Sequence, residues 1–244
     1  MKILSIGNSF SQDAQRYFKE VCKSSGIKNA QCINLYIGGC SLERHYLNIK
    51  GDLAAYSFEM NGESSGLSVS VKQALLCGGW DVITLQQASR LSYRYDTYEP
   101  YLKEIAAYVR EFCPKSKLAI HQTWGYADGT PNLESTGFSS HNEMFEQVRK
   151  AYEKAASDIN ADLIIPTGDA VKLLCGEYHM RAHRDFHLSY GLGRYTASLV
   201  WQYALTGVNP DNNSFCGFDE PVSDAEISAA KDCAKRAVEN MKNS

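Results

Sequence analysis

The sequence lacks several features that mark common classes of protein. It has no run of about 18 apolar residues, the minimum for a membrane-spanning helix, so we expect no membrane as a partner. Its 25 basic and 28 acidic residues give a net charge of −3 with no basic stripe, so we expect no nucleic-acid partner. There is no His-Glu-x-x-His, and the histidines show no recognised metal-ligand spacing; we therefore expect no metal and no cofactor.

Cysteine is not scarce, but none of the eight cysteines forms a Cys-x-x-Cys pair. A chain of 244 residues can bury a core without disulfide staples, so we interpret the cysteines as free residues in a reducing compartment. The first residues, Met1-Lys2-Ile3-Leu4, run directly into a predicted strand and leave no room for a signal peptide. The expected location is the cytoplasm, or outside the cell if a signal peptide has been removed from this sequence.

Apolar runs alternate with amphipathic segments along the chain. The predicted strands are 2–6, 31–36, 81–85, 117–121 and 162–165, and the predicted helices are 12–25, 97–112, 142–158, 191–205 and 224–241. Segment 54–71 predicts a hairpin that turns at Asn61-Gly62. Strands separated by helices favour a mostly parallel sheet covered on both faces. We therefore expect one domain over residues 1–244, a flavodoxin-like three-layer α/β/α sandwich with about five strands.

Polar clusters follow four of the predicted strands. In chain order they are Gly7-Asn8-Ser9, Gly38-Gly39-Cys40-Ser41, Gln86-Gln87-Ala88-Ser89 and His121-Gln122-Thr123-Trp124. The carboxyl ends of parallel strands meet at one edge of a sheet, and ligands bind there. The clusters therefore predict a single site.

The residue types at this edge suit acyl transfer, which needs a nucleophile, a base, an acid that orients the base, and donors for the oxyanion. Ser9 is the candidate nucleophile and His187 the candidate base, with Asp185 placed to orient it. Gly39 can bring its backbone N–H close to a substrate. Ser9 does not lie in Gly-x-Ser-x-Gly, so we do not expect the nucleophile elbow of the α/β-hydrolases. Taken singly, a serine at such a turn is more often a helix cap.

Four ordered blocks together resemble the SGNH (GDSL-like) hydrolases. They are Gly7-Asn8-Ser9-Phe10-Ser11, Gly39-Cys40-Ser41, the Gln86 segment and the Asp185/His187 segment. The resemblance implies a flavodoxin-like fold and ester hydrolysis, with Ser9 as nucleophile and His187 as base. It also implies an oxyanion hole built from the N–H groups of Ser9 and Gly39.

The sequence departs from the pattern of that family at three places. Asn8 replaces the usual aspartate of Gly-Asp-Ser. The third block is similar to the Gln-Gly-Glu variant of carbohydrate acetylesterases, which makes Gln86, rather than Gln87, the expected third oxyanion donor. The last block normally reads Asp-x-x-His, but Arg184 stands three residues before His187. Either Asp185 still reaches the imidazole, or a Ser-His dyad works with a backbone carbonyl, or the site is degraded.

The loops at the predicted site are rich in amphipathic aromatic residues: Tyr36, Tyr46, Tyr93, Tyr95, Trp124 and Tyr126. Such rings suit sugar substrates, and we expect Trp124 and Tyr126 to bind substrate. The expected function is removal of acetyl or other short acyl groups, with a carbohydrate or other small-molecule ester as substrate. The alternatives are a lipase or thioesterase of the same fold and a non-catalytic carbohydrate-binding module.

Overall fold

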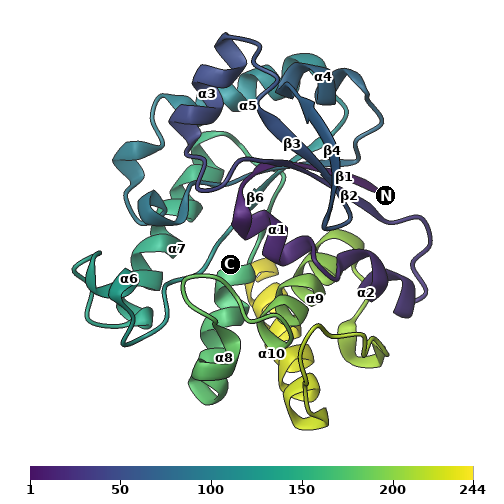
Figure 1. The fold of residues 1–244 in the computed structure, drawn as a ribbon, viewed down its shortest axis with the longest axis vertical. Coiled ribbons are helices and arrows are strands. Elements are labelled where there is room, and N and C mark those ends of the chain that lie inside the picture. Colours follow the sequence, from purple (N-terminus) through teal and green to yellow (C-terminus); the bar gives the residue numbers. More distant parts are fainter. Residues whose placement is uncertain (244) are drawn as a thin grey trace.

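In the computed structural model, which describes residues 1–243, the strands form one mixed sheet with helices on both faces (Figure 1). The strand order is β4-β3-β2-β1-β5-β6-β7. The strands are β1 (Lys2–Gly7), β2 (Gln31–Tyr36), β3 (Tyr56–Met60), β4 (Glu63–Val69), β5 (Val82–Leu85), β6 (Lys117–His121) and β7 (Leu163–Ile165). Apart from β3 and β4, the strands pair in parallel, which confirms the expected parallel core of the sheet.

The predicted hairpin is also confirmed, and it extends the sheet with two antiparallel strands, β3 and β4. Asn61 and Gly62 at its turn have φ angles of 52° and 81°. Both angles lie in the left-handed region, where asparagine and glycine are the favoured residues. The following Gly62-Glu63-Ser64-Ser65-Gly66 fits the pattern Gly-x-Ser-x-Gly, but Ser64 lies in the exposed strand β4 and not at a strand-to-helix turn. It is therefore not a nucleophile elbow.

Helices cover the sheet in two layers, as expected. They are α1 (Ser9–Gln15), α2 (Phe18–Ser24), α3 (Leu42–Lys50), α4 (Val71–Leu76), α5 (Tyr101–Phe112), α6 (Pro131–Glu134), α7 (His141–Asp158), α8 (Thr167–Ala182), α9 (Leu192–Thr206) and α10 (Asp224–Lys242). Figure 1 shows α3, α4 and α5 over one face and α1, α2 and α9 over the other. Helices α8 and α10 pack against α9, and α7 packs against β6 and β7. No helix within residues 1–243 is long and apolar enough to cross a membrane.

The helices differ from the sequence-based expectation at several places. The short helices α3, α4 and α6 were not predicted, and α5 begins at Tyr101 rather than at residue 97. The helix predicted over 12–25 is divided into α1 and α2, and α1 begins earlier, at Ser9, because the Asn8 side chain caps it. Helix α8 was not predicted, because its apolar residues do not form a single stripe and Gly168 and Gly176 interrupt the pattern. Helix α8 leads directly into the loop that carries His187, and it therefore helps to position that residue.

The core contains the central strand β1, whose Ile3, Leu4 and Ile6 are fully buried. All eight cysteines are unpaired, and five of them are buried. Two buried histidines are also part of the core. The ring of His45 bonds to the Tyr56 hydroxyl at 2.9 Å through Nδ1, and that of His121 packs edge-on against Trp201. Burial lowers the pKa of both imidazoles to about 3.

These pKa values predict that the fold loses stability in mild acid. His45 stays neutral in the folded chain, whereas in the unfolded chain it takes up a proton below about pH 6.5. Because the unfolded state then binds more protons, the free energy of unfolding falls as the pH drops, by about 2 kcal/mol per buried histidine between pH 7 and pH 5. Urea unfolding of wild type and His45→Gln at both pH values measures this. The variant should lose about 2 kcal/mol less than wild type over that interval; an equal loss in both proteins would contradict the prediction.

Candidate active site

Ser9 is the first residue of α1, directly after the central strand. The Asn8 carboxamide caps the helix by accepting a hydrogen bond from the Phe10 N–H at 3.0 Å, and Ser11 Oγ accepts one from the Asn8 N–H at 3.3 Å. A glycine is required at position 7, because a Cβ there would lie 1.9 Å from Ser11 Oγ. The tight strand-to-helix turn thus brings Ser9 to the carboxyl end of β1.

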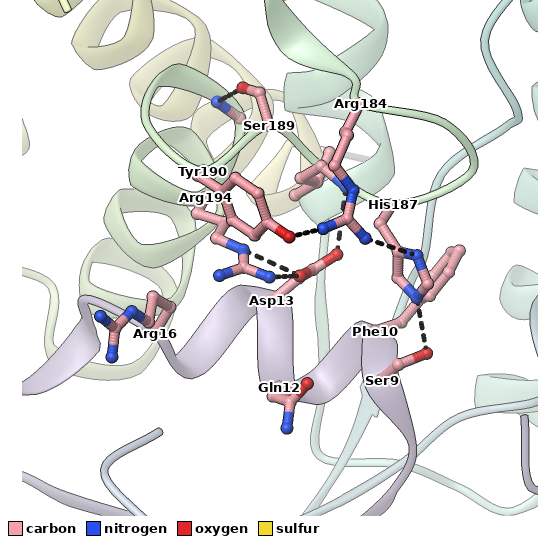
Figure 2. Close-up of polar contacts among 12 residues, drawn as sticks. Ser9, Phe10, Gln12, Asp13, Arg16, Arg184, His187, Ser189, Tyr190 and Arg194 are labelled. Atoms are coloured by element: carbon pink, nitrogen blue, oxygen red, sulfur yellow. Dashed lines mark hydrogen bonds and ion pairs between the residues drawn. The ribbon is translucent and has the colours of Figure 1, made fainter. Parts of the chain in front are cut away.

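The loop between α8 and α9 brings His187 to Ser9 (Figure 2). Its Nε2 lies 2.9 Å from Ser9 Oγ, although 178 residues separate the pair in sequence. The loop is closed by an antiparallel bridge between His183 and Leu188 and by a 3.0 Å hydrogen bond from the Arg184 N–H to the His187 carbonyl. The structure therefore brings together the serine and histidine predicted from the sequence.

Two side chains approach the other ring nitrogen of His187. Asp185 Oδ1 lies 3.2 Å from Nδ1 and also accepts a hydrogen bond from the His187 backbone N–H at 2.6 Å. Arg184 Nη2 lies 3.4 Å from the same Nδ1. Asp185 therefore reaches the imidazole despite its shortened spacing, while Arg184 occupies the sequence position where the SGNH pattern has its acid.

The two neighbours favour opposite tautomers of His187. A carboxylate accepts a proton, so Asp185 favours a hydrogen on Nδ1 and leaves the Nε2 lone pair free for the Ser9 hydroxyl. A guanidinium has only donors, so Arg184 favours a hydrogen on Nε2. Only the first arrangement lets His187 take the serine proton. The contact with Asp185 thus favours the tautomer whose Nε2 can accept a hydrogen bond from Ser9.

Asp13, one helical turn after Ser9 in α1, holds the loop that carries His187. Its buried carboxylate accepts a 3.1 Å hydrogen bond from the Leu188 N–H and pairs with Arg194 of α9 at 2.7 Å (Figure 2). Burial raises the pKa of Asp13, while the positive charges of Arg194 and of protonated His187 act against that rise. Asp13 therefore places a buried carboxyl group beneath the loop that carries His187.

Two arginines lie on one aromatic ring at the rim of the site. The guanidinium groups of Arg184 and Arg194 lie 4.6 and 4.5 Å from the centre of the Tyr190 ring. Arg184 also donates a hydrogen bond to the Tyr190 hydroxyl, as Figure 2 shows. This contact holds Arg184 at the edge of the site and limits its approach to His187.

Ser9 and His187 open into a pocket of about 600 Å³. Gly39, with a φ of 60°, and Arg90, which donates to the Gly39 carbonyl at 2.9 Å, line its opposite side. Among residues 1–243, no hydrogen bond uses the backbone N–H of Ser9 or of Gly39. Both residues line the pocket, and their N–H groups are thus free to donate to a ligand there.

The structure does not bring Gln86 into the pocket, contrary to the sequence-based expectation. Gln86 is buried, its Nε2 donates to Asn8 Oδ1 at 2.7 Å, and its Oε1 accepts from Ser11 Oγ at 2.9 Å and lies 2.6 Å from His121 Nδ1. Gln87 is buried as well and bonds to the backbone of Leu42. Gln86 therefore holds the cap of the Ser9 helix and is not placed as a third oxyanion donor.

The prediction that Trp124 binds substrate is also wrong. Its ring is fully buried, stacks on Phe10 at 4.2 Å, and donates to the Phe186 carbonyl at 3.0 Å. A ring with no exposed surface cannot bind a sugar, so Trp124 supports the pocket from beneath. Tyr126 does line the pocket, with its hydroxyl bonded to Ser89 Oγ at 2.9 Å.

The sequence analysis missed Asp13, Tyr190 and Arg194. Asp13 had a signal, since an aspartate four residues after Ser9 lies on the same side of the helix as the nucleophile. Tyr190 and Arg194 follow His187 closely, but nothing in their spacing indicates that they stack and pair in three dimensions.

Comparison with known families places the chain. Residues 2–237 match the model of DUF4886, a domain of unknown function. The chain belongs to the DUF4886 family. A crystal structure of a DUF4886 family protein from Bacteroides uniformis is 35% identical, with a TM-score of 0.88 over 98% of this chain and 94% of that one. No curated protein sequence matches this DUF4886 chain.

More distant structures share the fold. A provisionally assigned SGNH hydrolase from Slackia heliotrinireducens is 24% identical, with a TM-score of 0.61 over 83% of this chain and 97% of that one. An acetyl xylan esterase is 16% identical, with a TM-score of 0.53 over 84% of this chain and 100% of that one. This family member therefore has the α/β fold of the SGNH hydrolases.

We predict that Asp13→Asn destabilises the fold. Asparagine can still accept from Leu188, but it leaves the guanidinium of Arg194, only 13% exposed, without its carboxylate. Removing one member of a buried ion pair costs roughly 3 kcal/mol. Urea unfolding measures the loss. Asp211→Asn is the matched control, because it removes the exposed Asp211–Lys235 pair and should change stability far less. Equal losses of stability in the two variants would contradict the prediction that the buried Asp13–Arg194 pair stabilises the fold more than the exposed pair does.

Proposed function

We propose that this chain is a serine ester hydrolase that removes acetyl or other short acyl groups, with a carbohydrate ester as substrate, through an acyl-Ser9 intermediate. The observation that carries the proposal is the 2.9 Å contact between Ser9 Oγ and His187 Nε2 at the edge of an open pocket. A serine and a histidine so far apart in sequence meet at a strand end, where this type of sheet binds ligands.

In the first half of the reaction Ser9 Oγ attacks the ester carbonyl carbon while its proton moves to His187 Nε2. The resulting oxyanion accepts hydrogen bonds from the N–H groups of Ser9 and Gly39. The carboxylates of Asp185, beside Nδ1, and Asp13, beneath the loop, stabilise the imidazolium. The C–O bond to the alcohol then breaks, and His187 gives its proton to the departing alcohol oxygen.

In the second half His187 takes a proton from water, and the hydroxide attacks the acyl carbon of acyl-Ser9. The same N–H groups hold the second oxyanion. When the bond to Ser9 Oγ breaks, the proton on Nε2 returns to the serine, and the carboxylic acid leaves. The free enzyme is restored with no cofactor consumed.

The lining of the pocket supports a short acyl group. It contains the aromatic rings of Phe10, Tyr36, Tyr126, Phe186 and Tyr190. Between them lie polar and charged side chains, among them Gln12, Arg90 and Asn132. Rings beside polar groups suit a sugar, whereas a long acyl chain needs a continuous apolar groove. The acetyl xylan esterase with this fold is in keeping with that choice.

We predict that Ser9→Ala and His187→Ala each lower turnover of p-nitrophenyl acetate by at least about 1,000-fold, since each removes a group that moves in the bond-making step. Initial rates, with circular dichroism to verify folding, measure this. Ser64→Ala is the matched control: Ser64 lies in the exposed strand β4, and its loss should leave the rate unchanged. A wild type inert towards this ester and a panel of acetylated sugars would instead indicate a binding module.

The same assay with p-nitrophenyl esters of increasing chain length separates the enzymatic alternatives. Rates that fall beyond the short esters support an acetylesterase. Rates that rise with chain length would favour the lipase or thioesterase and would overturn the short-acyl part of the proposal.

We predict that Asp185→Asn lowers kcat about 100-fold, because it removes the acceptor that keeps hydrogen on Nδ1 of His187. Arg184→Gln is the control at the neighbouring position. It removes the competing guanidinium and should not reduce kcat. Steady-state kinetics of both variants tests the assignment. An Asp185→Asn enzyme as fast as wild type would mean that the working unit is a Ser9–His187 dyad.

A further inference from the structure

Three metal-binding side chains gather beneath the His187 loop. His141 begins α7, Cys175 lies on α8, and His183 follows the end of α8. One ring nitrogen of each imidazole and the sulfur of Cys175 all lie within 4.8 Å of one another. Residues from separate elements thus place nitrogen and sulfur donors around one point, outside the pocket that holds Ser9.

The cluster contains donor atoms that the protein itself does not use. Within residues 1–243, Nε2 of His141 and Nε2 of His183 are buried and have no hydrogen-bond partner. The two histidines are only 1% and 6% exposed. Buried polar atoms almost always have partners, so a pair of unpartnered ring nitrogens in one cluster calls for an explanation.

The surroundings of His141 prepare it as a ligand. Its Nδ1 lies 3.3 Å from the Tyr126 carbonyl, which can only accept, so the hydrogen of a neutral ring belongs on Nδ1. The Nε2 lone pair is then free. A backbone carbonyl that fixes the other ring nitrogen in this way is the usual support of a metal-binding histidine.

The distance between the thiol and one of the imidazoles also suits a zinc ion. Cys175 Sγ lies 3.6 Å from His183 Nδ1, so Nδ1, and not the unpartnered Nε2, is the ring nitrogen of His183 that faces the thiol. In a tetrahedral zinc site, with bonds of about 2.0–2.3 Å, neighbouring donor atoms lie about 3.3–3.8 Å apart. The donor atoms of all three residues lie within 4.8 Å of one another, so one ion can be placed among them.

From this geometry we propose that His141, Cys175 and His183 form a binding site for one Zn²⁺ ion. A thiolate with imidazoles is a donor set that selects zinc over magnesium or calcium. The fourth position belongs to water, because Nε2 of the neighbouring His179 already accepts a hydrogen bond from the Asp128 N–H at 2.9 Å. His179 is part-exposed and so gives the ion a route from solvent.

The site would fix the loop that carries the base. His183 pairs with Leu188 across the base of that loop, and His187 lies between them in sequence. A zinc ion that ties His183 to α7 and α8 therefore restrains His187 without touching the reacting atoms. The role is structural, and metal binding can be measured whether or not the chain proves to be an esterase.

The test uses full-length protein freed of metal with a chelator, in a Cys77→Ser/Cys216→Ser background, because those exposed thiols could bind metal adventitiously. Titration with Co²⁺ should saturate at one equivalent, with the intense visible bands of a tetrahedral site and a thiolate charge-transfer band in the near ultraviolet. Zn²⁺ should abolish these bands by displacement and raise the unfolding temperature.

Substitutions locate the ion. Cys175→Ser should lose the charge-transfer band, and His141→Gln and His183→Gln should each weaken binding at least about 10-fold. Cys113→Ser, which removes a buried cysteine remote from the cluster, should behave like the background protein. A background protein that binds no Co²⁺, or folded variants that bind it as before, would overturn the proposal.

A measurement without substitutions in the cluster covers the case in which these variants fail to fold. Zn²⁺ should slow alkylation of Cys175 in the background protein, read by mass spectrometry of its peptide, while alkylation of the remaining buried cysteines serves as the internal reference. Equal rates at Cys175 with and without Zn²⁺ would contradict a metal bound to its thiolate.

Discussion

The hydrogen bond from the Leu188 N–H to the buried carboxylate of Asp13 joins the two halves of the candidate site. Ser9 belongs to α1, which the central strand positions, whereas His187 belongs to a loop between distant helices. Without a link between α1 and that loop, the 2.9 Å contact of serine and histidine would depend on the loop alone. Asp13 supplies the link one turn after Ser9, and the guanidinium of Arg194 keeps its charge satisfied in a buried place.

Much of the scaffold could be predicted because it follows from local rules. The parallel strands are short apolar runs, and Asn61-Gly62 has the residue types that a tight hairpin turn demands. Ser9, Gly39 and His187 could be selected as candidates because each lies in a short motif next to a strand or helix end, and the structure places all three on one pocket. Helix α8 escaped prediction for the opposite reason: it is covered on several sides, so its sequence shows no clear amphipathic stripe.

The orientation of side chains was harder to predict than their position along the chain. Gln86 ends its strand at the expected edge, but its carboxamide turns inward to Asn8, Ser11 and His121. Trp124 follows β6 at the same edge and yet stacks beneath Phe10. Both depend on which neighbours leave room for them, and those neighbours come from distant parts of the chain. The histidines illustrate the same point, since His141 lies far in sequence from Cys175 and His183.

The His187 loop is held differently at its two ends, and this bears on how the site works. At its C-terminal end, Leu188 is tied to Asp13 and thereby to the helix of the nucleophile. At its N-terminal end, His183 lies in the cluster with His141 and Cys175, where a ring nitrogen of each histidine has no hydrogen-bond partner within residues 1–243. His187 lies between these two ends, and its Nδ1 faces both Asp185 and Arg184. The contacts at both ends of the loop therefore set the position of His187 relative to Ser9, Asp185 and Arg184.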